Sequence, residues 1–262
     1  MNSITRHFPK ACFRALGYYP ASIGGFDFRV DPYHIRFWSG AARGKWEPRT
    51  FEILKEFLAE DSIYCDVGAW VGPTVIYAAR LCREVICFEP DPAAYRYLSW
   101  NIELNELDNV KPFNCALADR RGIRRMSSFG GSRGDSMTSL LDPDSAGTSV
   151  GTSVDVLTLT WNDVQEIPHI DRIDMMKIDI EGGEFELLPA LRDFLAERKP
   201  VVYLSTHAPY LEEDEREEKM ALIAEVMGVY GKCLDDELNP VPVDQLTGRD
   251  ARENFRAFVF MD

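Results

Sequence analysis

Short apolar runs alternate with helical stripes through the middle of the chain. Five runs are typical of strands buried on both faces: 63–67, 85–88, 110–115, 173–180 and 201–204. Most segments between them repeat apolar residues at every third or fourth position, as amphipathic helices do. With two further strands expected at 229–234 and 255–260, the pattern predicts an α/β fold built on a doubly wound, mostly parallel seven-stranded sheet.

The first 45 residues follow a different pattern, and we expect them to form an N-terminal extension. Residues 4–16 have the spacing of a short amphipathic helix. Apolar and polar positions alternate between 26 and 37 on both sides of Asp31-Pro32, which predicts a β-hairpin. Residues 46–262 are then expected to form the main domain.

Three local signals organise this domain. Pro48 is expected to open its first helix, and Asp91 to cap a later helix that Pro92 opens. The acidic run at 212–219 is expected to start a helix, where carboxylates favour the positive end of the dipole. Glycines, serines and threonines break the alternation at about 126–153, which predicts a flexible insertion, either an inert surface loop or a lid over the substrate.

Charge and cysteine content narrow the classes of partner. The net charge of −14 repels a phosphate backbone, so we expect no nucleic-acid binding and a small-molecule substrate instead. The six cysteines have neither CxxC nor zinc-ligand spacing, which favours a reduced, cytoplasmic protein. No apolar stretch reaches 18 residues, and we therefore expect no membrane span. The oligomeric state has no signal in the sequence.

A glycine-containing turn follows the first central strand. Asp66 lies at the end of the strand, and Gly68 and Gly72 have a spacing that differs from the GxGxxG of dinucleotide sites. Trp70 stands where that fingerprint has its second glycine and would block a pyrophosphate. S-adenosylmethionine (SAM) fits better, with Asp66 near its ammonium group and Glu89, after the next strand, accepting hydrogen bonds from both ribose hydroxyls.

Five motifs follow one another over roughly residues 44–207: Trp46-Glu47-Pro48, Asp66 to Gly72, Phe88-Glu89-Pro90, Asn114 to Asp119 and Met176 to Gly182. In these motifs and their order the chain resembles the FkbM-type family of SAM-dependent methyltransferases, which have a Rossmann-like fold. The chain departs from the family pattern at Trp70 and Pro73. The resemblance implies SAM as cofactor, with contacts from Glu47, Asp66, Gly68, Ala69, Gly72, Glu89, Asn114, Ala116 and Asp179.

A second polar cluster lies on the strand at 173–180. Lys177, Asp179 and Glu181 recur at every second position, so an extended chain points all three to one side. Open α/β sheets bind their ligands at the carboxyl ends of their strands. The resemblance places this segment beside the methyl group of the cofactor, which makes Asp179 a candidate for contact with the sulfonium or the substrate. Glu181 is the candidate for substrate orientation or proton acceptance, and Lys177 is expected to form an ion pair with one of these carboxylates.

His207 follows the neighbouring strand, so it is expected to converge with Asp179 and Glu181 and is the candidate general base. Carboxylates also suit Mg²⁺, which leaves a divalent-metal site at Asp179, Glu181 and Asp155 as an alternative. Because no third ligand of known geometry supports that site, the sequence does not favour a metal.

These observations favour a SAM-dependent methyltransferase. Its expected reaction is O-methylation of a hydroxyl on a small molecule such as a sugar or a secondary metabolite, and the choice of oxygen rests on the resemblance. The alternatives are an NAD-dependent oxidoreductase and a SAM-binding protein of the same fold that transfers no methyl group. Trp70 either packs the following helix against the sheet or reshapes the cofactor pocket.

Overall fold

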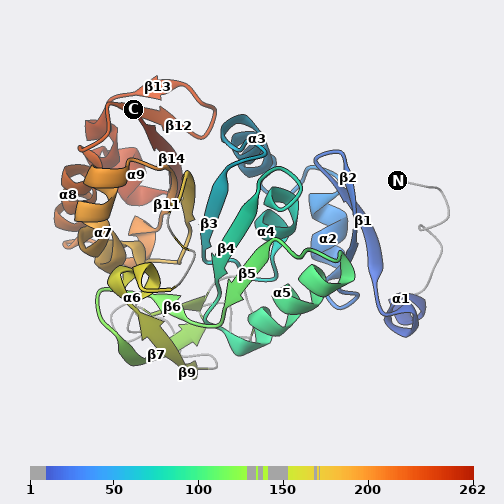
Figure 1. Cartoon of the computed structure of the whole chain (residues 1–262). Coiled ribbons are helices and arrows are strands. Elements are labelled where there is room, and N and C mark those ends of the chain that lie inside the picture. The colour runs from blue at the N-terminus through green and yellow to red at the C-terminus, as the bar shows by residue number, and fades with distance from the viewer. Residues whose placement is uncertain (1–9, 129–133, 135–137, 141–152, 168–169, 171) are drawn as a thin grey trace.

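An eight-stranded sheet runs through the centre of the molecule (Figure 1). The computed structural model describes residues 10–128, 134, 138–140, 153–167, 170 and 172–262. In sheet order the strands are β13 (Pro240–Val241), β12 (Lys232–Asp235), β14 (Arg256–Met261), β11 (Val201–Thr206), β10 (Met175–Ile178), β3 (Ile63–Val67), β4 (Glu84–Phe88) and β5 (Val110–Phe113).

The five central strands β11, β10, β3, β4 and β5 pair in parallel, whereas β14 is antiparallel to both of its neighbours. The α/β fold and its seven expected strands are confirmed, with the difference that the sheet is mixed. The eighth strand, β13, has two residues, which is too short for an alternating pattern to reveal it.

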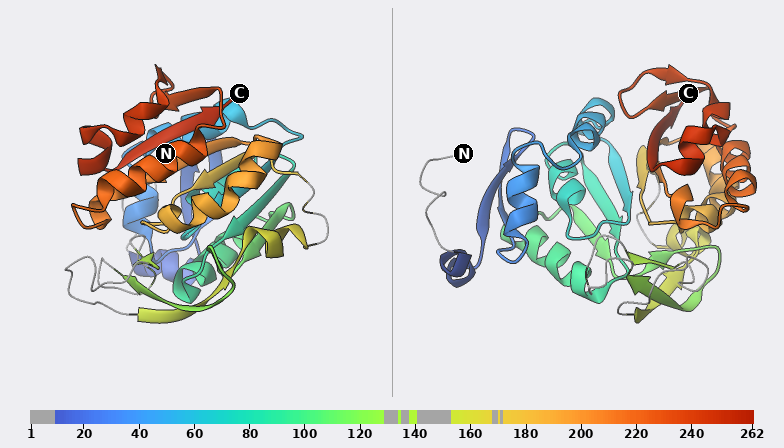
Figure 2. Two further views of the ribbon diagram at one scale, coloured as in Figure 1. Left: turned by 90° about the vertical axis from the view of Figure 1, so that its left-hand side faces the viewer. Right: turned by 180° about the vertical axis from the view of Figure 1, so that it is seen from behind.

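Successive residues of the central strands enter two different apolar cores. Ile63, Cys65 and Val67 of β3 pack into one core, whereas Tyr64 packs into the other. The first core is covered by α6 (Trp161–Gln165), α7 (Glu184–Arg198), α8 (Arg216–Met227), α9 (Arg249–Glu253) and the 3₁₀ turns η2 (Ala208–Tyr210) and η3 (Val243–Thr247). Figure 2 shows α7 and α8 side by side on this face.

The second core lies under α3 (Pro48–Phe57), α4 (Pro73–Ala78) and α5 (Pro92–Leu104). Helix α3 begins at Pro48, and α5 begins at Pro92 with Asp91 accepting hydrogen bonds from Ala93 N and Ala94 N at 2.7 and 3.4 Å, as the sequence predicts. Helix α8 begins inside the acidic run at 212–219, with two glutamates in its first turn.

The N-terminal extension contains α1 (Lys10–Leu16), β1 (Tyr19–Ile23), β2 (Phe26–Val30) and α2 (Ile35–Ala41). The extension contains a hairpin, but the pairing predicted over 26–37 was wrong: β2 pairs with the preceding β1, and residues 35–37 belong to α2. Residues 35–37 are helical because Asp31 Oδ1 accepts hydrogen bonds from Tyr33 N and His34 N and turns the chain into α2. Residues 4–9 of the first predicted helix lie outside the described residues.

The extension shares the second apolar core with the main domain, through residues such as Phe13, Phe28 and Trp38. The buried amide of Asn101 on α5 joins the two parts. Its Oδ1 accepts a hydrogen bond from Asp31 N at 2.7 Å, and its Nδ2 donates to Val71 O at 2.8 Å. The division into residues 1–45 and 46–262 stays a prediction.

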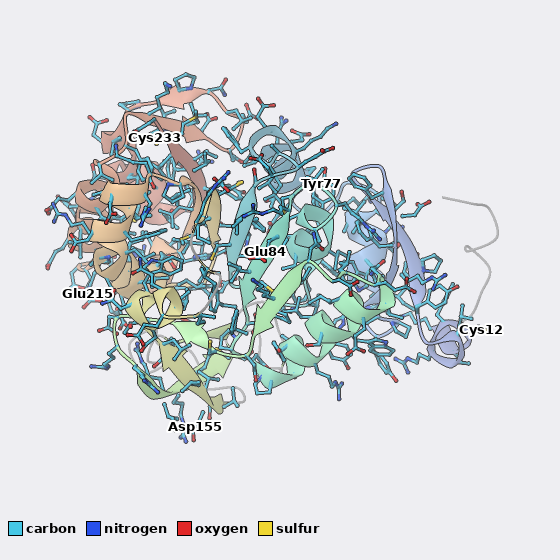
Figure 3. All side chains as sticks on the ribbon, viewed as in Figure 1. Cys12, Tyr77, Glu84, Asp155, Glu215 and Cys233 are labelled. Carbon is cyan, nitrogen blue, oxygen red and sulfur yellow. The ribbon has the colours of Figure 1, made fainter. Side chains whose placement is uncertain are left out.

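A four-stranded sheet lies beside the large one, in the order β6 (Ala116–Leu117), β9 (Ser153–Leu159), β7 (Gly122–Ser128) and β8 (Thr138–Ser139). Most of the predicted insertion at 126–153 falls outside the described residues. Figure 3 places Asp155 on this small sheet, where its carboxylate pairs with Arg125. None of the helices in the described residues combines the length and hydropathy that a membrane crossing requires.

Candidate active site

The carboxyl ends of β3, β10 and β4 lie close together at the turn that follows β3. Gly68 has φ +93°, and a Cβ added there would lie 1.9 Å from the carbonyl oxygen of Asp179, at the end of β10. Gly72 has φ +88°, and a Cβ there would lie 2.6 Å from Leu98 Cδ1 on α5. Gly68 N and Ala69 N also donate hydrogen bonds to Phe88 O at the end of β4. Both glycines therefore allow close packing of protein against protein.

Asp66 is fully buried beneath this turn. Its Oδ2 accepts hydrogen bonds from Tyr64 Oη and Thr74 Oγ1, and its Oδ1 lies 3.5 Å from Lys177 Nζ. Burial raises the pKa of Asp66, although Lys177 opposes the shift. Lys177 also lies 3.2 Å from Asp179 Oδ2, which confirms its predicted ion pairing with a carboxylate. Asp66 thus holds Thr74 and Lys177, whose side chains face a surface hollow.

Glu89 sits at the end of β4 and is 5% exposed. Its Oε2 accepts a hydrogen bond from Trp70 N at 2.8 Å, and its Oε1 accepts one from Asp91 N at 2.7 Å. Burial raises the pKa of Glu89 to about 8. Because each carboxylate oxygen has two lone pairs, the side chain can still accept hydrogen bonds from a ligand.

Trp70 adopts φ +50°, which is rare for a bulky residue, with its backbone N–H held by Glu89. Its indole Nε1 donates to Gly134 O at 2.9 Å, and its ring meets the edge of Phe37 on α2 at a centroid distance of 4.5 Å. The indole therefore packs against the N-terminal extension while also lining the site. The packing partner is α2, rather than the following helix and the sheet that the sequence suggested, and the indole also lines both hollows.

Two adjoining hollows lie at these strand ends. The smaller is lined by apolar side chains together with Glu89 and Ala116. The larger is lined by charged, aromatic and small residues, including Glu47, Lys177, His207 and Ala69. Both hollows share four residues: Gly68, Trp70, Asp179 and Glu181.

Two predicted contact residues lie at the margin of the site. Asn114 is exposed, and its Nδ2 donates to Glu89 O at 2.8 Å and Pro90 O at 3.1 Å, so it supports the chain that carries Glu89. Glu47 adopts φ +35° before α3, and its Oε2 accepts a hydrogen bond from Thr50 Oγ1. Asp66, Gly72 and Asn114 line neither hollow, whereas the other predicted contact residues do.

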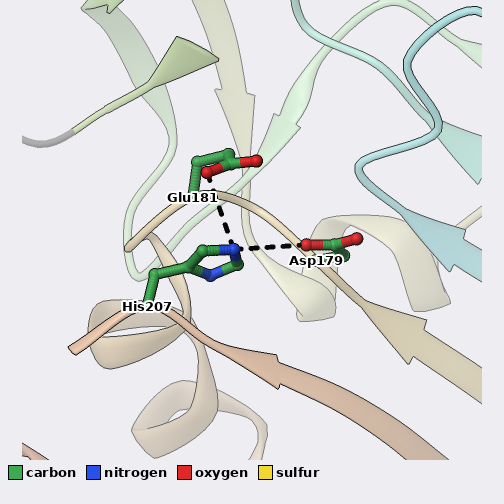
Figure 4. A group of neighbouring side chains, drawn as sticks. All are labelled: Asp179, Glu181 and His207. Carbon is green, nitrogen blue, oxygen red and sulfur yellow. Dashed lines mark ion pairs between the residues drawn. The ribbon is translucent and has the colours of Figure 1, made fainter. Parts of the chain in front are cut away.

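Asp179, Glu181 and His207 converge where the two hollows meet (Figure 4). His207 Nε2 lies 3.4 Å from Asp179 Oδ1 and 3.5 Å from Glu181 Oε2. Burial raises the pKa of Glu181 to about 7. Burial also raises the pKa of Asp179, but the charges of Lys177 and His207 outweigh that effect and lower it.

Glu184 completes the cluster from the first turn of α7, and no sequence pattern indicated its role. It is fully buried, and its Oε1 accepts from His207 N at 2.7 Å and lies 3.2 Å from His207 Nδ1. Burial lowers the pKa of His207, but Glu184, followed by Asp179 and Glu181, raises it to about 9. In sequence, Glu184 looks like an exposed carboxylate at a helix start, which is where most such residues lie.

The parallel core with an antiparallel β14, the glycine turn after β3 and the acidic residue after β4 define a Rossmann-like methyltransferase. The chain belongs to the FkbM methyltransferase family: the model of the methyltransferase FkbM domain matches residues 66–231. This membership argues against the dinucleotide alternative.

Several curated proteins and a solved structure are similar to this chain. Methyltransferase 1 of Beauveria bassiana is 25% identical over 149 residues, covering 51% of this chain and 60% of the relative. Methyltransferase sdnD of Sordaria araneosa is 28% identical over 157 residues, covering 50% and 61%. The tRNA (guanine(37)-N(1))-methyltransferase of Batrachochytrium dendrobatidis is 33% identical over 93 residues, covering 35% and 18%. The FkbM methyltransferase structure from Methylobacillus flagellatus has a TM-score of 0.47 and 13% identity, covering 91% and 63%.

Proposed function

We propose that this methyltransferase uses SAM and methylates a hydroxyl oxygen of a small molecule. The observation that carries the proposal is the pair of hollows that meet at Gly68, Trp70, Asp179 and Glu181. The smaller, more apolar hollow suits the adenosine, with Glu89 beside the ribose. The larger, charged hollow suits the methionine end of the cofactor and the acceptor.

The reaction is a displacement at carbon. The acceptor oxygen forms a bond to the methyl carbon as the bond from that carbon to sulfur breaks, which leaves S-adenosylhomocysteine (SAH). The hydroxyl proton passes to an acidic side chain of the larger hollow or to water. Because the step needs the three reacting atoms in line, holding both ligands in adjoining hollows supplies much of the rate enhancement.

Cofactor binding is tested by titrating SAH in a calorimeter. At pH 9, where the Glu89 carboxylate is ionised, we expect saturable binding, which Glu89→Gln weakens about 10- to 150-fold by loss of hydrogen bonds to a charged group. Glu84→Gln is the matched control, because Glu84 lies at the opposite end of the same strand and pairs with Lys111. If SAH fails to bind, or if both variants bind it equally well, the cofactor assignment is wrong.

The acceptor is tested by mass spectrometry on a library of hydroxylated small molecules incubated with protein and SAM. A gain of one methyl group on an oxygen supports the proposal. Transfer RNA belongs in the same screen, because shorter segments of this chain match tRNA methyltransferases. The net charge of −14 disfavours RNA, and methylation of RNA alone would overturn the small-molecule assignment. SAH binding without any methyl transfer would favour the non-catalytic alternative.

The six free thiols support a cytoplasmic location.

A further inference from the structure

Three potential metal ligands point toward one another where the hollows meet. Asp179 Oδ1 and Glu181 Oε2 lie 3.4 and 3.5 Å from His207 Nε2, and one ligand atom from each of the three residues lies within 4.8 Å of the others. Adjacent ligands of an octahedral ion at about 2.1 Å lie about 3 Å apart. Small side-chain rotations would therefore bring all three atoms into one coordination sphere.

The imidazole is already oriented as a metal ligand. His207 Nδ1 faces Glu184 Oε1, and the other oxygen of Glu184 accepts a hydrogen bond from Gly182 N at 2.8 Å. A carboxylate on Nδ1 holds a proton there, so a metal ion at the cluster would take the place of the proton on Nε2, which faces Asp179 and Glu181. Histidines that bind metals usually have such a carboxylate or carbonyl partner on the second nitrogen.

The charges of the cluster also favour a cation. Asp66, Asp179, Glu181 and Glu184 bring four carboxylates, and Lys177 contacts two of them. These four carboxylates outnumber the two basic side chains that contact them, Lys177 and His207. Negative charge at this depth is costly unless a cation accompanies it, and a divalent ion offsets most of it.

We propose that Asp179, Glu181 and His207 bind one divalent metal ion between the two hollows. Two oxygens with one imidazole nitrogen favour Mn²⁺ or a similar transition metal over Mg²⁺. Three protein ligands leave about three positions of an octahedral ion for water or for an acceptor that offers two adjacent oxygens. This description of the acceptor rests on the proposed function, whereas the ion site does not.

In this arrangement the ion orients the acceptor and stabilises its ionised oxygen. The hydroxyl proton goes to water, and the oxygen then attacks the methyl carbon as described above. The metal site considered from the sequence combined Asp179 and Glu181 with Asp155. In the structure, Asp155 lies on the small sheet and pairs with Arg125. The structure supplies His207 as the third ligand in its place.

The site is tested by electron paramagnetic resonance with Mn²⁺ on protein saturated with SAH, so that the cofactor already occupies its place. We expect one saturable Mn²⁺ per chain, with coupling to a nitrogen nucleus that disappears in His207→Gln. Glu181→Gln, which alters a partly exposed residue, should weaken Mn²⁺ binding at least tenfold. Glu184→Gln should weaken it about 10- to 100-fold, although Glu184 does not touch the ion.

Glu213→Gln is the control, because Glu213 is exposed in the acidic run before α8. It should leave the affinity unchanged, and retained SAH binding shows that each variant is folded. Failure of SAH-loaded protein to bind Mn²⁺ with saturation, or equal affinities in Glu181→Gln and Glu213→Gln, would overturn the ion site. Methyl transfer that continues in a strong chelator would overturn the role of the ion in the reaction, while leaving the proposed function intact. Mn²⁺ binding that depends on His207, in a protein without transferase activity, would support the ion site and reject the function.

Discussion

Gly68 offers a direct measurement of how tightly the carboxyl ends of β3 and β10 are packed. In Gly68→Ala, the new Cβ would lie 1.9 Å from the carbonyl oxygen of Asp179, whereas ordinary contact begins near 3.4 Å. The segments that carry Gly68 and Asp179 must therefore move apart locally by about 1.5 Å. Neighbouring strands are usually about 4.8 Å apart. Overpacking of this kind costs about 1–3 kcal/mol. The positive φ adds about 1–2 kcal/mol for any residue with a Cβ.

Gly25 is the matched control for this substitution. Its φ is +92° against +93° for Gly68, but a Cβ added there meets no atom within 4 Å. Gly25→Ala should thus lose only the conformational contribution of about 1–2 kcal/mol, and Gly68→Ala about 2–5 kcal/mol in total. Urea unfolding of both variants measures the difference, and calorimetry with SAH should show weaker binding in Gly68→Ala alone. Equal destabilisation of the two variants would refute the close approach of β3 and β10.

Other contacts give predictions of the same kind. Asp31→Asn should lower the free energy of unfolding in urea by about 1.5–3 kcal/mol. The reason is that this buried carboxylate accepts hydrogen bonds from His34 and from an indole of α2. Asp27→Asn, which alters an exposed residue, should lower it little. Burial raises the pKa of Asp31, but these hydrogen bonds lower it overall. The contribution of Asp31 to folding stability should therefore be present above pH 3.8 and vanish as the pH falls through the folded-state pKa. Equal acid sensitivity in both variants would contradict this. Burial raises the pKa of Glu89 to about 8, so its acid form must lose a proton before it can accept hydrogen bonds from both ribose hydroxyls. SAH affinity should therefore rise from pH 7 to 9. An equal rise in Glu89→Gln would show that Glu89 does not cause it. Asn114→Ala should weaken SAH binding about 2- to 10-fold by freeing the chain at Glu89, and unchanged affinity would show that this support is dispensable.

The central sheet was predictable because its strands are buried on both faces and nearly every position is apolar. The N-terminal extension was harder, because residues 35–37 alternate like a strand while Asp31 turns the same residues into a helix. An alternating pattern over three residues cannot compete with a side chain that satisfies two backbone N–H groups at once. The small sheet was missed for a related reason: two of its four strands have only two residues.

The candidate site was predictable where it depends on strand ends. His207 and Asp179 follow adjacent parallel strands, so topology alone brings them together. Glu184 could not be found in this way, because its burial depends on how α7 meets the end of β11, and sequence spacing does not encode that contact. Asn114 was placed in the site by resemblance, whereas its contacts show that it supports the backbone around Glu89.

Asn101 connects the N-terminal extension to the turn in which we expect the cofactor to bind. A single amide group holds the extension through Asp31 N and the cofactor turn through Val71 O. This amide is a physical link between docking of the extension and binding in the turn, and any coupling that it carries is reciprocal: docking changes the ligand affinity by the same factor by which the ligand changes the docking equilibrium. A cofactor that stiffens the turn should accordingly protect the amide hydrogens of α2 from exchange, at a distance from any atom that it touches.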